Sequence, residues 1–183
     1  WYALVIGEKV NNIKIVGKGN IIGNGRELAN NFTAQVHAGV IKDPLKYDRV
    51  GTRPRLIYLR ECQDVVIDGI TLKESAEWVQ TYDQCVDVVV NNIFVESTAF
   101  WNNDGIDIVD CNGFLLTNSY FNSSDDAICL KSHSKDAICQ NVEVRNCTAR
   151  SSASGIKFGT FGFGGFKNIK IINNRVYDTH RSA

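Results

Sequence analysis

The stretches Cys62-Gln-Asp-Val-Val-Ile-Asp-Gly-Ile70 and Cys85-Val-Asp-Val-Val-Val-Asn-Asn-Ile93 are two copies of one short pattern. Further copies run over residues 111–119 and 139–147, and a fifth runs over residues 166–174, where Phe166 takes the place of the leading cysteine. Successive copies begin 23, 26, 28 and 27 residues apart, and residues 10–18 form an earlier copy. A pattern that returns at such a period is typical of proteins built from stacked structural repeats.

Each copy contains residues that favour short β-strands. Runs of β-branched or alternating apolar residues are broken by Asn, Gly or Ser, and helical periodicity is poor. The spacing fits neither helical repeats of about 34 residues nor propeller blades of about 40. We therefore expect an all-β protein, a right-handed parallel β-helix of about six coils with roughly 25 residues each. The expected turn residues, which tolerate left-handed backbone angles, are Gly69, Asn92, Asn118, Asn146 and Asn173.

We expect one β-helix domain over residues 1–183, interrupted by an insertion around residues 26–52. This stretch contains Pro44 and several polar residues and lacks the repeat, so we interpret it as a long loop or a short helix. Both ends of the chain are expected to be cut from a longer protein, because the sequence opens at Trp1 inside an apolar run and contains no Met.

The composition argues against several classes of partner. The chain has 20 basic and 20 acidic side chains, which leaves no net field to attract nucleic acid or an anionic membrane. No apolar run approaches the roughly 20 residues that span a bilayer. We expect a monomer that is secreted or periplasmic. The six cysteines could form disulfides, but the repeated position of four of them favours thiols stacked in the core.

A second set of strands follows the expected turns and should present two faces. Side chains alternate along a strand, so one set should point into the coil. The expected outward column contains Asp107, Cys129 and Lys157, with Lys131 two positions beyond Cys129. The expected inward residues are Ile106, Ile108, Ile128, Leu130, Ile156 and Phe158.

Three carboxylates lie directly before these strands. Asp104 belongs to one coil, while Asp125 and Asp126 belong to the next, so stacking should bring them to one corner of the helix. Because like charges repel, at least one carboxyl should resist ionisation, and acids with separated pKa values are suited to general acid/base hydrolysis. They could instead be simple turn residues or ligands of Ca²⁺. Lys131 and Lys157 argue against a metal site, so no metal and no cofactor is expected.

These residues carry a resemblance to a known family. Asn102-Asn-Asp-Gly-Ile-Asp107 resembles the Asn-Thr-Asp-Gly-x-Asp motif of the family 28 glycoside hydrolases, and Ser124-Asp-Asp-Ala-Ile-Cys-Leu-Lys131 is similar to the family's Asp-Asp motif with its following strand. Residues 23–26 and Arg53-Pro54 add to the likeness. The resemblance implies hydrolysis with inversion, with Asp125 as general acid and with Asp104 and Asp126 positioning and activating water.

The same resemblance implies substrate contacts by Asn102, Asp107 and Lys131, whereas Lys157 is expected from its place beside the carboxylates to bind an acidic sugar or to lower their pKa values. The chain departs from the family at Ala153-Ser-Gly155, where Gly-His-Gly is usual. An Arg-x-Lys motif is expected only beyond residue 183.

The expected function is a glycoside hydrolase that acts on polygalacturonate or a related acidic polysaccharide. Two alternatives remain open from the residues: a β-helix lyase or epimerase, and a carbohydrate-binding solenoid without turnover.

Overall fold

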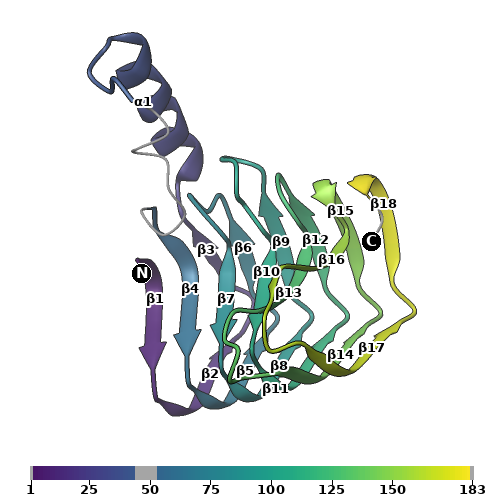
Figure 1. The fold of residues 1–183 in the computed structure, drawn as a ribbon. Helices are drawn as coiled ribbons and strands as arrows, with labels where there is room; N and C mark the ends of the chain where they lie inside the picture. Colours follow the sequence, from purple (N-terminus) through teal and green to yellow (C-terminus); the bar gives the residue numbers. More distant parts are fainter. Residues whose placement is uncertain (1, 44–52, 182–183) are drawn as a thin grey trace.

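The computed structural model describes residues 2–43 and 53–181, and these form three parallel sheets of six strands each (Figure 1). The first sheet contains β1 (Ala3–Glu8), β4 (Arg55–Arg60), β7 (Gln80–Asp83), β10 (Ile106–Val109), β13 (Ile128–Ser132) and β16 (Ile156–Gly162). The second contains β2 (Asn11–Val16), β5 (Gln63–Asp68), β8 (Val86–Asn91), β11 (Asn112–Thr117), β14 (Cys139–Arg145) and β17 (Phe166–Ile172). The third contains β3 (Asn20–Ile22), β6 (Thr71–Lys73), β9 (Phe94–Ser97), β12 (Tyr120–Ser123), β15 (Thr148–Ser154) and β18 (Arg175–Arg181).

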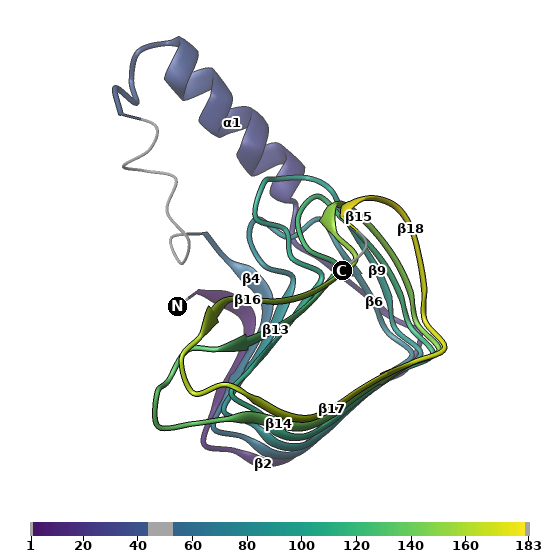
Figure 2. The ribbon, with the colours of Figure 1, turned by 45° about the vertical axis from the view of Figure 1, so that its right-hand side comes forward.

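The chain visits the three sheets in turn, so each group of three strands makes one coil. Every strand pairs in parallel with the strand three places along the chain, and the coils stack into a right-handed parallel β-helix with a three-sided cross-section (Figure 2). The predicted fold class is confirmed.

Residues with left-handed backbone angles stack at the corners. Each of the five predicted turn residues has a positive φ, between 51° and 78°. Two further columns were not predicted. One, beside the start of the second sheet, contains Glu61, Gln84 and Asp110, and the other, within that sheet, contains Asp64, Asp87, Gly113 and Asn141.

The interior of the helix is filled by aliphatic, aromatic and thiol side chains from successive coils. Cys62, Cys85, Cys111 and Cys139 occupy equivalent positions where the strands of the second sheet begin, and all six cysteines, which lie in the described part of the chain, are buried and free. The Sγ atoms of Cys85 and Cys111 lie 3.4 and 3.2 Å from the carbonyl oxygens of Leu59 and Tyr82. The structure thus favours stacked thiols over disulfides.

Five of the six residues that were predicted to face the interior are buried, and the sixth, Phe158, is exposed. The other five predicted inward residues are at most 6% exposed, whereas Phe158 is 49% exposed. Phe158 is in register with Leu130, and within the described residues β16 is the edge strand of its sheet, with no later strand beside the ring. Its ring packs edge-on against Phe166, with 5.2 Å between centroids.

The insertion contains a helix, α1 (Gly25–His37), which projects from the body of the β-helix (Figure 2). Gly25 is required where α1 leaves the coil, because a Cβ there would lie 2.2 Å from the carbonyl oxygen of Ser75. Phe32 anchors α1, its ring centroid 5.7 Å from that of Trp101. Of the predicted insertion, residues 44–52 lie outside the described residues. No helix in the described ranges is long and apolar enough to cross a membrane.

A pair of adjacent leucines tests the two faces of the second sheet. Leu116 is 0% exposed, while Leu115, on the same strand, is only partly buried. Leu116→Asp places a carboxylate inside the coil and should cost several kcal/mol of unfolding free energy. Leu115→Asp should cost about 1 kcal/mol or less. Urea unfolding of both variants measures the difference, and equal losses would contradict the assignment of faces.

Candidate active site

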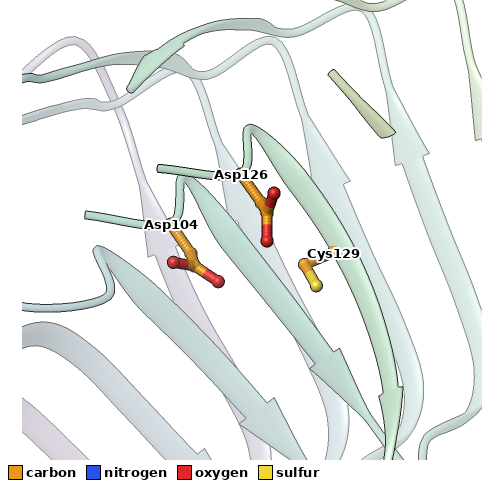
Figure 3. A group of neighbouring side chains, drawn as sticks. All are labelled: Asp104, Asp126 and Cys129. Carbon is orange, nitrogen blue, oxygen red and sulfur yellow. The ribbon is translucent and has the colours of Figure 1, made fainter. Parts of the chain in front are cut away.

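Asp104 and Asp126 meet at the corner where the chain passes from the third sheet to the first. Each residue lies just before a strand, β10 or β13, and the backbone N–H of Gly105 donates to the carbonyl oxygen of Asp126 at 2.8 Å. A side chain at position 105 would place Cβ 2.5 Å from the carbonyl oxygen of Ala127, so the glycine permits this close approach. Figure 3 shows both carboxyl groups, with the thiol of Cys129 beside them.

The loop before Asp104 is held by the buried side chain of Asn103. Its Nδ2 donates to the backbone carbonyl oxygens of Ser75 and Glu77 at 3.0 and 2.9 Å, and its Oδ1 accepts from the hydroxyl of Ser97. These bonds reach across to the preceding coil. Sequence reasoning gave Asn103 no role, although an amide has the donors and acceptor that such a loop requires.

Lys131 forms a buried ionic cluster with two of the predicted carboxylates. Its Nζ lies 2.9 Å from Asp107 Oδ1 and 3.3 Å from Asp104 Oδ2. It also donates to the carbonyl oxygen of Gly159 at 3.3 Å and lies 2.8 Å from Cys129 Sγ. The Asp107 side chain is 0% exposed and that of Lys131 only 5%, so both charged groups are shielded from solvent.

Lys157 forms a second ion pair, with Asp126. The two groups are 2.6 Å apart, and the Asp126 side chain is 3% exposed while that of Lys157 is 30% exposed. The other oxygen of Asp126 accepts from the backbone N–H of Ser154 at 3.2 Å. The predicted column is also confirmed, because Asp107, Cys129 and Lys157 are in register on β10, β13 and β16.

Asp125 lies closer to solvent than the other two predicted acids and is half-buried. Its Oδ1 accepts from the backbone N–H of Asp126 at 2.9 Å, and its Oδ2 lies 3.5 Å from Nδ2 of Asn102. The Oδ1 of Asn102 accepts from the guanidinium of Arg53 at 3.2 Å. Because Arg53 can only donate, this contact turns the amide of Asn102 so that its NH₂ group faces Asp125.

Burial and neighbouring charges separate the protonation states within the cluster. Burial, reinforced by the nearby charge of Asp107, raises the pKa of Asp104 well above its usual range, against the opposing effect of Lys131. Burial alone would lower the pKa of Lys131, but Asp107 and Asp104 outweigh it and raise this pKa. Burial also raises the pKa of Asp107, against the opposing effect of Lys131. These shifts favour a charged Lys131 beside a protonated Asp104.

The donor atoms of Asp104, Asp126 and Cys129 lie within 4.8 Å of one another, which is close enough to hold a metal ion. Each already contacts an ammonium group: Lys131 contacts Asp104 and Cys129, and Lys157 contacts Asp126. Calcium is bound by oxygen ligands, whereas one of the three donors is a thiol. The donor set therefore suits the two lysines better than calcium.

Sequence reasoning missed the aromatic side of the cluster. The ring of Trp78 lies 4.7 Å from Lys131 Nζ and 4.4 Å from the guanidinium carbon of Arg55. Arg55 is fully buried and pairs with Glu77 at 3.1 Å. The available signal is the repeat itself, which places residues 78–81 one coil before the strand that follows Asp104.

The matched family model is described as "Glycosyl hydrolases family 28" and covers residues 2–182. The chain belongs to glycosyl hydrolase family 28. Family membership agrees with the placement of the two Asp motifs on adjacent coils, and it confirms the resemblance read from residues 102–107 and 124–131.

Curated relatives include probable exopolygalacturonases B from Aspergillus species. The Aspergillus flavus protein is 27% identical over 156 residues, and the Aspergillus terreus protein is 29% identical over 158 residues. Each alignment covers 82% of this chain and 33% of the relative, so the chain spans about a third of the length of these relatives.

Solved structures with the same fold include two bacterial exopolygalacturonases. The hyperthermoactive enzyme of Thermotoga maritima has a TM-score of 0.78 and 22% identity, with 100% of this chain and 48% of that one covered. The family 28 enzyme of Yersinia enterocolitica has a TM-score of 0.75 and 19% identity, covering 92% and 36%. These likenesses show the fold.

The raised pKa of Asp104 predicts a pH-dependent stability. Ionising this acid in the folded protein is costly, so folding is penalised once the pH exceeds the unfolded value of about 4, and the penalty grows until the folded pKa is reached. Asp104→Asn should therefore raise the Tm at pH 7 by a few degrees, since about 1 kcal/mol corresponds to about 2–4 °C. The gain should shrink at pH 3.

Thermal unfolding at pH 7 and pH 3 measures this gain in Tm, with the exposed Asp136→Asn as control. A larger gain at pH 3 would contradict the prediction.

Proposed function

We propose that this protein hydrolyses pectin-type polysaccharide, with polygalacturonate as the leading substrate, by acid/base catalysis with inversion. The observation that carries the proposal is the convergence of Asp104 and Asp126 from adjacent coils, beside the more exposed Asp125, in a chain of glycosyl hydrolase family 28. The names of the curated relatives, probable exopolygalacturonases, support the choice of substrate.

The proposed roles are those that the family resemblance implies, and the accessibility of each carboxyl group supports them. Asp125 is half-buried and closest to solvent, and it gives its proton to the glycosidic oxygen as the bond to the anomeric carbon breaks. Asp126 takes a proton from the water that attacks this carbon from the opposite face of the sugar. Asp104 holds that water beside Asp126. One bond to oxygen forms as the other breaks, which inverts the anomeric centre.

Four further residues are proposed to hold the substrate in place. Asn102 lies next to Asp125, and Lys157 is partly exposed, so both are placed to contact a sugar directly. Lys131 and Asp107 are buried beneath this surface, where their charges can act on a bound acidic sugar from below. An acidic glycan suits this site, because the partly exposed ammonium group of Lys157 has further N–H donors that can reach a sugar carboxylate.

We further propose that the protein acts as a monomer outside the cytoplasm, by secretion or in the periplasm. A pectin polymer is too large to enter a cell intact, so its first cleavage takes place outside. The balance of 20 basic and 20 acidic side chains supports neither a nucleic-acid partner nor an anionic membrane surface.

Reducing ends released from polygalacturonate, with ultraviolet absorbance followed in parallel, test the proposal. The intact protein should release reducing ends without a rise in absorbance, and Asp125→Asn should lower the rate by about 10²-fold or more. A rise in absorbance would indicate an unsaturated product and favour a lyase. Binding without product would favour a carbohydrate-binding solenoid, and full activity of the variant would remove Asp125 as the acid.

Chelation tests whether the cluster in Figure 3 depends on a metal. Because Lys131 and Lys157 already neutralise its donor groups, millimolar EDTA should leave the rate of reducing-end release unchanged. Strong inhibition that added Ca²⁺ reverses would contradict this expectation and assign the three donors to a cation.

A further inference from the structure

Lys157 is turned toward an acid rather than toward solvent. It lies on β16, and its side chain is 30% exposed, so it is able to extend into water. Its Nζ nonetheless lies 2.6 Å from Oδ2 of Asp126, which comes from the preceding coil. The contact brings a positively charged side chain from the outer face of the first sheet against a carboxylate that is only 3% exposed.

Asp126 has two other acidic groups and a thiol close by. Asp125 is its neighbour in the chain, the carboxyl of Asp104 lies within 4.8 Å, and the thiol of Cys129 lies equally close. Lys131 is engaged by Asp104, Asp107 and Cys129. Among the described residues, Lys157 is the cation that forms an ion pair with Asp126, and the backbone N–H of Ser154 is the second donor.

Both oxygens of Asp126 therefore accept hydrogen bonds, one from an ammonium group and one from the backbone N–H of Ser154. Such an arrangement favours the carboxylate over the acid and fixes the direction in which its remaining lone pairs point. Asp126 also affects the lysine. Burial would lower the pKa of Lys157, but the hydrogen bond to Asp126 raises it, which agrees with a charged pair.

We propose that Lys157 is a positioning residue that keeps Asp126 ionised and aimed as the proton acceptor for the attacking water. The inference rests on the proposed hydrolytic function and goes beyond it, because Lys157 then acts on the reaction through Asp126 as well as on the substrate. The loss of Lys157 would leave Asp126 among acids without its ammonium partner.

The decisive experiment compares Lys157→Met with Lys157→Arg by the pH dependence of kcat and KM on polygalacturonate. Lys157→Met should lower kcat about tenfold or more and should move its acidic limb to higher pH, because protonation of Asp126 becomes easier. Lys157→Arg should restore most of kcat and the position of the limb. Lys170→Met, which removes an exposed lysine from the outer face of β17, should match the unaltered protein in both parameters.

A purely substrate-binding lysine would give a different result. KM would rise in Lys157→Met while kcat and the acidic limb of its pH profile stayed unchanged, and this outcome would overturn the inference. Unchanged kcat and KM in Lys157→Met would overturn it as well. If the unaltered protein releases no reducing ends from any pectin-type substrate, the proposed function fails instead, and the two failures are thereby distinguished.

A titration that requires no turnover tests the same inference if the protein or a variant has too little activity to measure. The carboxyl carbon of Asp126 can be titrated by ¹³C NMR and assigned with Asp126→Asn. The inference expects the midpoint for Asp126 to move to higher pH in Lys157→Met and to stay near its original position in Lys157→Arg. An unmoved midpoint in Lys157→Met would contradict it.

Discussion

The parallel hydrogen bonding between successive coils is the constraint on which the rest of the molecule depends. A strand of one coil can satisfy its backbone groups only from the coils before and after it, so each residue faces its counterpart one coil away. Columns of like residues follow from this register. The core thiols and the left-handed turn residues repeat because an equivalent position meets an equivalent environment in every coil.

The candidate site follows from the same register, but here the type of residue at equivalent positions differs from coil to coil. At the outward position of the first sheet, Asp107, Cys129 and Lys157 succeed one another. At the corner before these strands, Asp104 lies next to Asp126. The stack thereby places acids beside amines without a dedicated binding loop. Asp104, Asp107 and Asp126, the buried carboxyl groups of the site, each lie beside an ammonium group, which compensates for the burial of charge.

The features that repeat could be predicted from the sequence, because a period is visible in one chain without any coordinates. The solenoid, the five turn residues and the meeting of Asp104 with Asp126 all follow from spacing. The choice of partner by each lysine could not be predicted, since a long side chain reaches several acids and only packing selects one. Lys131 takes Asp104 and Asp107, and Lys157 takes Asp126. The exposure of Phe158 was also missed, because alternation along a strand predicts the direction of a side chain and not which neighbouring strands cover it.

The stacking of coils makes the geometry of the site discrete. Neighbouring strands are held about 4.8 Å apart, so an acid transferred to another coil moves by a whole step and cannot be shifted by a fraction of one. Evolution of this surface can therefore adjust the distance between two functional atoms only through side-chain length and rotamer. Lys157, which reaches back one full coil to meet Asp126, is an adjustment of that kind. A shorter residue at position 157 would leave a gap that the rigid backbone could not close.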